Sequence, residues 1–209
     1  MGSPPFGILC YFLIFLVVVL FPAPGTSSLT VISPENLKGR HQTAMAKFGN
    51  KLDHGDSIGG TVVYPSVNQK GCEDFGSSGL SFHAKKSWTV PTFLLVDRGD
   101  CYFALKVWNA QKVGAIAVLI ADYAENTNLV AMDSPIEESA ISTYLHNITI
   151  PSVLVSKSFG DQVKQALSSG EIVNMKLGWS TEAEGRIGDC YFALKLVWNI
   201  ALKGRSIGC

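Results

Sequence analysis

The sequence predicts an α+β fold organised around one strand–helix–strand unit in the middle of the chain. Two short apolar runs, residues 93–96 and 115–120, have the length of buried strands. Between them, residues 101–114 change to helical spacing, and Gly114 ends the predicted helix. A helical crossover of this length normally joins parallel neighbouring strands and is right-handed. These observations together indicate a central βαβ unit.

The predicted helix has an apolar face and a candidate capping residue. Phe103, Val107, Ala110 and Gly114 fall on one face, and Ala104, Trp108 and Gln111 lie beside them. Asp100 comes directly before the helix. We expect its carboxylate to cap the helix by accepting a hydrogen bond from an N–H group of the first turn.

The turn at residues 97–100 is a candidate ligand site. Asp97, Arg98, Gly99 and Asp100 favour turns, and they lie where the predicted strand gives way to the helix. Backbone N–H groups and the helix dipole favour negative charge there. Ligands of α/β sheets tend to bind at such strand ends. Many βαβ units bind nothing at this turn, so its position alone leaves both interpretations open.

The flanking sequence predicts further strands and a second helix. The expected strands are residues 29–32, 58–64, 80–82, 148–155 and 172–177. Helical spacing predicts a helix over residues 158–168, ended by Gly170. Pro151 indicates that its strand is an edge strand or begins there. Residues 44–48 fit neither pattern clearly.

Composition divides the 209 residues into three predicted parts. Residues 1–28 are expected to be a signal peptide, because the apolar stretch 8–21 is shorter than the roughly 20 residues of a membrane span and small residues follow it. An uncleaved signal anchor is the alternative, and either segment directs the chain into the secretory pathway. Residues 29–180 form the predicted domain. The tail, residues 181–209, is expected to be irregular.

The predicted tail contains a partial copy of residues 98–109. The copy has one inserted residue, Leu196, and no preceding strand. One insertion rotates the later half of a helix by roughly 100°, which breaks the apolar stripe. We therefore expect no independent fold there, and a second ligand turn is the weaker alternative.

Charge and motifs exclude several classes of function. Seventeen Lys and Arg residues balance seventeen Asp and Glu residues, so bulk charge does not favour a nucleic acid or a membrane surface as partner. No catalytic motif is found, and the four histidines lack partners at metal-ligand spacing. We therefore expect no enzyme activity, metal or cofactor. A cation site at residues 53–56 and integrin adhesion through Arg98-Gly99-Asp100 are weaker alternatives.

The cysteines and one sequon give two further predictions. Cys10 lies in the predicted signal peptide, and Cys190 and Cys209 lie in the tail, so Cys72 and Cys101 remain for the domain. In an oxidising lumen this pair should form a disulfide that ties residues 66–86 to the turn. The spacings match no zinc pattern. Asn147 begins the sequon Asn-Ile-Thr and should be exposed if it is glycosylated.

These residues leave a recognition surface as the candidate function. Arg98 offers a planar, always charged fork suited to a carboxylate or a carbonyl. Residues 132–138 bring Asp133, Glu137 and Glu138, which could meet a basic side chain. A bound peptide would also need main-chain donors and acceptors, which a turn and an exposed strand edge supply.

Five segments together resemble the protease-associated domain of plant vacuolar sorting receptors. They are residues 60–65, 68–72, 91–103, 132–135 and 147–152, within a match that runs from about residue 29 to residue 179. The resemblance implies a mixed β-sandwich or open barrel with flanking helices. It also implies capture of soluble vacuolar proteins through short sorting peptides of the Asn-Pro-Ile-Arg type, in the lumen of the Golgi and prevacuolar compartment.

The resemblance also implies which residues bind the peptide. They are Arg98, Gly99, Asp100, Cys101, Tyr102, Phe103, Asp133 and Ser134. Ile136 stands where the family usually has an acidic residue, so affinity for a basic signal is expected to differ.

The family's calcium-binding EGF-like repeats, membrane helix and cytosolic tail are not found in this sequence, so we expect a truncated receptor domain that is either secreted or non-functional. Two alternatives remain open. One is a protease-associated domain that modulates a peptidase. The other is an interaction domain of a membrane-anchored ubiquitin ligase.

Overall fold

The computed structural model describes residues 25–53, 55–83, 90–125, 128–135, 138 and 142–181. Ser27–Trp179 forms one compact unit. Most of the predicted signal peptide and of the predicted tail lies outside the described residues, together with Cys10, Cys190 and Cys209. No helix in the described part of the chain is both long enough and apolar enough to cross a bilayer.

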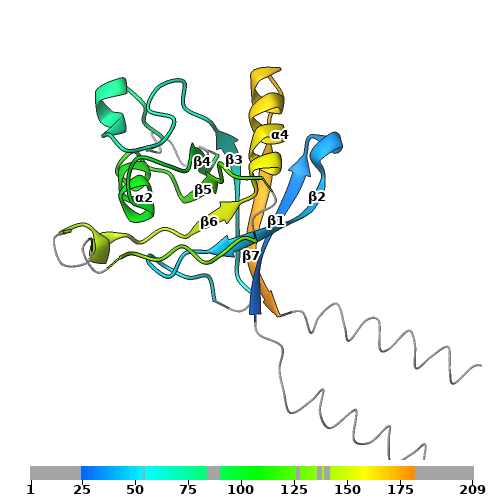
Figure 1. Ribbon diagram of the computed structural model, residues 1–209. Helices are drawn as coiled ribbons and strands as arrows, with labels where there is room; N and C mark the ends of the chain where they lie inside the picture. The colour runs from blue at the N-terminus through cyan, green and yellow to red at the C-terminus, as the bar shows by residue number, and fades with distance from the viewer. Residues whose placement is uncertain are drawn as a thin grey trace, which may run out of the picture. The chain divides into compact units, whose positions relative to one another are not determined.

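The strands of this unit close into a barrel in the order β1-β2-β6-β5-β4-β3-β7 (Figure 1). Their bounds are β1 (Gly25–Ser33), β2 (Gly39–Met45), β3 (Ser57–Val63), β4 (Thr92–Asp97), β5 (Ala117–Ala121), β6 (Ser152–Val155) and β7 (Asn174–Thr181). The run β3-β4-β5-β6 is parallel. The pairs β1–β2, β2–β6 and β3–β7 are antiparallel, so the predicted mixed sheet is confirmed.

The barrel is closed, whereas a mixed β-sandwich or an open barrel was expected. Closure depends on β2, which pairs with β1 on one side and with β6 on the other. The sequence did not predict β2, because its residues alternate between exposed and half-buried and only Met45 at the end is buried. Without β2, the predicted strands left no partner between β1 and β6, so closure of the barrel could not be predicted.

The predicted βαβ unit is confirmed as β4, α2 (Phe103–Lys112) and β5. The two strands run parallel, with Phe93 opposite Ala117 and Asp97 opposite Ala121. Gly114 follows the helix with a φ of +90°, a conformation that glycine adopts at little cost, as expected for the residue that ends a helix.

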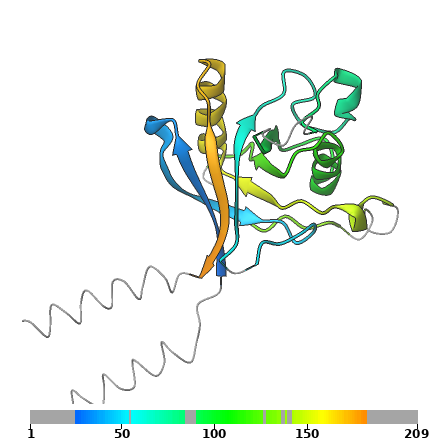
Figure 2. The same ribbon diagram turned by 180° about the vertical axis from the view of Figure 1, so that it is seen from behind.

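Alternate residues of β4 belong to two different hydrophobic clusters. Phe93 and Leu95 pack in the first cluster, which includes residues of most other strands and of α4 (Lys157–Ser168). Leu94 and Val96 pack in the second cluster with the apolar side of α2. A strand buried on both faces reads as a continuous apolar run, which is why residues 93–96 were predictable. Figures 1 and 2 show the two helices well apart on the barrel.

The helix predicted at residues 158–168 is confirmed as α4. Ser156 caps it, because its Oγ accepts a hydrogen bond from the Phe159 N–H at 3.3 Å. Pro151 directly precedes β6, which confirms it as a strand start. It does not mark an edge strand, because β6 pairs on both sides.

Two other strand predictions differ from the structure. Residues 80–82 form no strand; Leu80 and Phe82 pack against the second cluster from an irregular segment. The final strand begins at Asn174 and runs past Trp179 to Thr181. Three single-turn helices complete the described elements: η1 (Glu35–Leu37), η2 (Phe75–Ser78) and η3 (Leu145–Asn147).

Candidate functional site

The β4–α2 turn, residues 98–102, lies at the carboxyl ends of the parallel strands. Its backbone is anchored at the start, because the Arg98 N–H donates to the Ala121 carbonyl at 2.9 Å. The preceding Asp97 N–H donates to the Gln69 carbonyl at 2.8 Å. Gly99 and Asp100 both have positive φ, at +119° and +66°. The chain therefore bends sharply between a buried strand and a helix, and the turn faces outward.

Arg98 makes an ion pair with Asp122, the residue after β5. Nη1 of Arg98 donates to both carboxylate oxygens of Asp122 at 3.1 Å. The Asp122 side chain is 1% exposed and that of Arg98 is 31% exposed. The backbone N–H of Tyr123 also donates to Asp122, at 2.7 Å. The guanidinium is thus held in one orientation while part of it stays accessible.

Two aromatic rings flank this guanidinium. Its carbon lies 5.4 Å from the centre of the Phe103 ring and 4.9 Å from that of Tyr123, both within the range of a cation–π interaction. Phe103 is half-buried, whereas Tyr123 is 64% exposed. The turn therefore presents a fixed cation beside an exposed aromatic face.

The prediction that Asp100 caps α2 is wrong. Asp100 precedes the N-cap by two residues, and its carboxylate instead accepts from the Lys70 ammonium at 2.7 Å. This hydrogen bond holds the pKa of Asp100 below its usual range. The N-cap is Tyr102, and no side chain caps the helix there. The first N–H groups of α2 are consequently not satisfied by a capping side chain.

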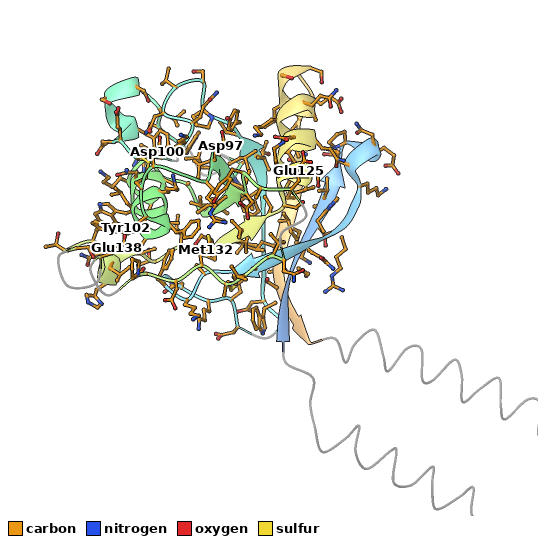
Figure 3. The ribbon with its side chains drawn as sticks, in the orientation of Figure 1. Asp97, Asp100, Tyr102, Glu125, Met132 and Glu138 are labelled. Atoms are coloured by element: carbon orange, nitrogen blue, oxygen red, sulfur yellow. A yellow bond between two sulfur atoms is a disulfide. The ribbon has the colours of Figure 1, made fainter. Side chains whose placement is uncertain are left out.

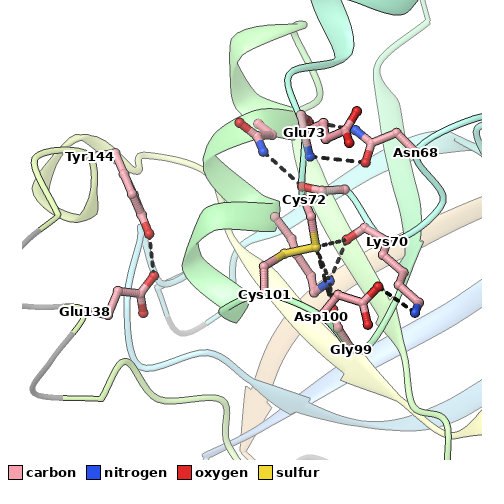
Figure 4. Close-up of a disulfide and its surroundings, with 12 residues drawn as sticks. Asn68, Lys70, Cys72, Glu73, Gly99, Asp100, Cys101, Glu138 and Tyr144 are labelled. Atoms are coloured by element: carbon pink, nitrogen blue, oxygen red, sulfur yellow. Dashed lines mark hydrogen bonds and ion pairs between the residues drawn. A yellow bond between two sulfur atoms is a disulfide. The ribbon is translucent and has the colours of Figure 1, made fainter.

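A disulfide joins Cys101 of the turn to Cys72, 29 residues earlier in the chain (Figure 4). The predicted tie between residues 66–86 and the turn is therefore present in the structure. Beside it lies Lys106 of α2, whose side chain is fully buried. Its Nζ donates to the carbonyls of Lys70 and Gly99, each at 2.6 Å, and lies 3.5 Å from Cys72 Sγ.

Lys106 was not among the predicted site residues, although the sequence contains a signal for it. Lys106 lies three residues after Phe103 and four before Ala110, on the apolar stripe that was assigned to the core. A lysine in that position means either that the apolar face was assigned wrongly or that the lysine is buried and its charge has partners. Asn109, also buried on α2, has a similar role, because its Nδ2 donates to the Gly71 carbonyl at 3.0 Å.

Asp133 and Ser134 lie in a different segment from the turn. Asp133 is exposed, and its carboxylate accepts a hydrogen bond from the Lys47 ammonium at 2.6 Å. This hydrogen bond and one from the Ser134 N–H lower the pKa of Asp133. The Ser134 Oγ is buried without a hydrogen-bond partner in the described part of the chain. In Figure 3, Met132, the neighbour of Asp133, lies apart from Asp97 and Asp100. No described contact brings Asp133 to Arg98.

Glu138 is not available to a ligand, contrary to expectation. It is 1% exposed, and its Oε1 accepts from the Tyr144 hydroxyl at 2.7 Å (Figure 4). Burial and this carboxylate raise the pKa of Tyr144. The Tyr144 ring stacks on Trp108 of α2, with ring centres 6.3 Å apart. Glu138 therefore holds its segment against the helix; Glu137 lies outside the described residues.

A second polar network joins the end of β4 to α4. One oxygen of Asp97 accepts from the Tyr64 hydroxyl at 2.6 Å, and the other accepts from Lys164 of α4 at 3.1 Å. Burial and the hydrogen bond to Asp97 raise the pKa of Tyr64. The residue immediately before Arg98 is thereby fixed from two sides.

The sequon residue Asn147 is exposed at the end of η3. Its Nδ2 donates to the Thr143 carbonyl at 3.0 Å. Among the described residues, no group of three or more His, Cys, Asp or Glu side chains is arranged to hold a metal ion. His54, part of the weaker cation alternative, lies outside the described residues.

The fold and this site define a barrel domain that displays a rigid, disulfide-held turn on a βαβ unit. The family model described as the PA domain matches residues 58–163, a range that begins in β3 and ends within α4. The chain therefore belongs to the protease-associated domain family.

The chain is also similar to named receptors from plants. It is 48% identical over 180 residues to vacuolar-sorting receptor 3 of Arabidopsis thaliana, covering 82% of this chain and 28% of that protein. It is 52% identical over 153 residues to vacuolar-sorting receptor 1 of Pisum sativum, covering 73% of this chain and 24% of that protein. The chain thus spans about a quarter of the length of these relatives, which carry the names of receptors and not of enzymes.

Among solved structures, a zinc aminopeptidase from Bacillus subtilis matches with a TM-score of 0.50 and 17% identity, over 76% of this chain and 31% of that one. This likeness concerns the fold alone. It carries no catalytic function over to this chain.

Proposed function

We propose that this domain is the lumenal cargo-recognition domain of a vacuolar sorting receptor and that it binds short sorting peptides of soluble vacuolar proteins. The observation that carries the proposal is the fixed Arg98 guanidinium beside the exposed Tyr123 ring, on a turn held by a disulfide. The similarity to named vacuolar-sorting receptors supports a receptor role in Golgi-to-vacuole transport.

The turn has suitable chemistry for a peptide. Both hydrogen bonds to Asp122 leave from Nη1, and a guanidinium has three nitrogen atoms, so Arg98 can hold Asp122 and a peptide oxygen together. The N–H groups at the start of α2, which no side chain caps, can meet a second oxygen. Tyr102, 43% exposed, and Tyr123 offer apolar surface to an aliphatic side chain.

The closed barrel changes how the peptide main chain would be held. Strand addition needs an unpaired sheet edge, and the described strands follow one another around the barrel. We therefore assign the main-chain contacts to the turn, with Gly99, Asp100 and Cys101 as its backbone, and to the start of α2 with Phe103.

Asp133 and Ser134 form a second contact region in the proposal. Asp133 is exposed, and a basic residue of the peptide would compete with Lys47 for its carboxylate. Ion pairs at the protein surface contribute little to stability, so such an exchange is energetically accessible. This region would adjust specificity, whereas the turn would supply most of the affinity.

Titration calorimetry with a synthetic peptide containing Asn-Pro-Ile-Arg tests the proposal. The ordered peptide should bind the domain in a saturable way, and a peptide with the same residues in scrambled order should bind much more weakly. Equal heats for both peptides would contradict sequence-specific recognition.

We further propose that the domain is lumenal and glycosylated at Asn147. The disulfide suits an oxidising compartment, and the exposed sequon is accessible to the glycosylation machinery. Protein expressed in a plant secretory pathway should lose mass on glycosidase treatment, and Asn147→Gln should abolish that loss. Wild-type protein whose mass does not change would contradict this proposal.

A further inference from the structure

Lys106 carries a buried charge that the proposed binding chemistry does not use. Its side chain is fully buried in the first half of α2, between the helix and the segment around Cys72. Lysine is almost never fully buried unless it has partners. Burying an ammonium group costs free energy unless the group has hydrogen-bond partners, which indicates a structural role for Lys106.

The partners of Lys106 belong to two separate segments. Its Nζ donates to the Gly99 carbonyl in the β4–α2 turn and to the Lys70 carbonyl in the segment after β3. Cys72 and Cys101 join the same two segments, each two residues further along the chain. The hydrogen bonds of Lys106 therefore join nearly the same points of the chain as the disulfide does.

Both bridges attach to the turn close to Arg98. Arg98 directly precedes Gly99, and the next residue, Asp100, has a φ of +66°, which is uncommon for residues other than glycine. The disulfide fixes the far end of the turn at Cys101. Lys106 fixes its middle at the Gly99 carbonyl, one residue from the guanidinium.

We propose that Lys106 is a positioning residue of the peptide-binding turn, whose ammonium holds Gly99 against Lys70 and so fixes Arg98 for recognition. This inference rests on the proposed function, because it concerns the same site. Lys106 would not touch the peptide. Its effect on affinity would pass through the order of the turn.

A pH dependence follows from this arrangement. Burial lowers the pKa of Lys106 to about 8. The charged groups that face it are Asp100, Asp97 and the Lys70 ammonium; the two carboxylates favour the ammonium form and Lys70 opposes it. Lys106 is therefore charged at neutral and acidic pH. As the pH rises through about 8 it loses its charge, and its hydrogen bonds to the two carbonyls weaken.

Hydrogen exchange of the turn tests the inference without any peptide. The backbone N–H groups of Arg98, Cys101 and Gly71 each donate to a described carbonyl. In Lys106→Met, the protection factors of these amides should fall at least about tenfold, the effect of losing charge-assisted hydrogen bonds. Lys112→Met is the control, because Lys112 lies on the same helix and pairs with Asp74 at the surface. Unchanged protection in Lys106→Met would overturn the proposal.

A pH profile of the wild-type protein covers the case in which Lys106→Met does not fold. Protection of the Arg98 and Cys101 amides, corrected for intrinsic exchange, should fall between pH 7 and pH 9.5, around the pKa of about 8. Protection of the Val118 amide, which donates to the Pro151 carbonyl within the barrel, should stay constant. A flat profile at the turn would overturn the inference.

Peptide titration separates this inference from the proposed function. Affinity of the ordered peptide should fall in Lys106→Met and stay unchanged in Lys112→Met. If exchange increases in Lys106→Met while the ordered peptide binds no better than the scrambled one to any variant, the positioning role stands and the proposed function fails.

Discussion

The side chains of Arg98 and Asp122 meet across the carboxyl ends of two neighbouring parallel strands, β4 and β5. Both oxygens of the buried Asp122 carboxylate accept from the same guanidinium nitrogen at 3.1 Å. Arg98 therefore has a structural role in addition to the recognition role proposed for it. The two roles can be separated by experiment, because one concerns stability and the other affinity.

Arg98→Ala should lower both peptide affinity and stability. Removing the guanidinium leaves a buried Asp122 carboxylate, whose Oδ1 still accepts from the N–H groups of Tyr123 and Ala124. We expect a loss of about 1–3 kcal/mol in the free energy of unfolding, less than for a fully buried pair because Arg98 is partly exposed. Urea denaturation measures this loss.

The double variant Arg98→Ala/Asp122→Asn is the matched control for that prediction. It replaces the buried carboxylate by a neutral amide, so it should cost less than the sum of the two single variants. Strictly additive losses would show that the 3.1 Å contact contributes little in solution. Neither result bears on peptide binding, which calorimetry measures separately.

Tyr123→Ala should lower peptide affinity without a matching loss of stability. The ring is 64% exposed, so its removal should change the free energy of unfolding by no more than about 0.5 kcal/mol. Ile172→Ala is a control of similar exposure, 68%, located just before β7. Equal affinities for wild type and Tyr123→Ala would remove Tyr123 from the proposed site.

Replacing both Cys72 and Cys101 by alanine should destabilise the domain. The two cysteines are 29 positions apart in the sequence, and for a loop of that size the chain-entropy model gives a contribution of about 3 to 4 kcal/mol from the disulfide. The variant should also bind peptide more weakly, because Cys101 anchors the turn. Thermal unfolding monitored by circular dichroism measures the first effect, and an unchanged melting temperature would contradict it.

Gly160→Ala should destabilise the domain even though alanine favours helices. Gly160 lies in α4, and a Cβ there would come within 2.5 Å of the Ala121 Cβ on β5. Overpacking of this kind costs about 1–3 kcal/mol, which exceeds the gain of about 1 kcal/mol in helix propensity. Ser168→Ala, at the end of the same helix, is the control and should be nearly neutral. Gly170→Ala is less suitable, because Gly170 has a positive φ that alanine adopts only with strain. A stabilised Gly160→Ala variant would mean that α4 can move away from β5.

The sequence predicted elements that are buried or strongly periodic. Residues 93–96 and 158–168 were assigned correctly because burial on both faces and helical spacing leave clear patterns. β2 was missed because its residues contribute little to the core before Met45. A strand defined mainly by its pairing with β1 and β6 leaves no such pattern in its own residues.

The candidate turn is a prediction from the sequence, whereas its internal contacts are known only from the structure. Arg98 and the Cys72–Cys101 pair follow from residue types and their positions, whereas the pairing of Arg98 with Asp122 depends on strand register. Asp100 was assigned to the helix cap from proximity alone, and its bond to Lys70, from a distant segment, could not be read locally. The burial of Lys106 could not be predicted from its residue type, because its partners, the Lys70 and Gly99 carbonyls, come from two other segments of the chain.

Mapping the bound peptide on the isotopically labelled domain by NMR tests the central claim most directly. On addition of the ordered peptide, the largest amide shift changes should lie at residues 98–103 and at Tyr123, with smaller changes near Asp133. Shift changes confined to another surface, with the amides of Arg98 and Tyr102 unaffected, would contradict the account.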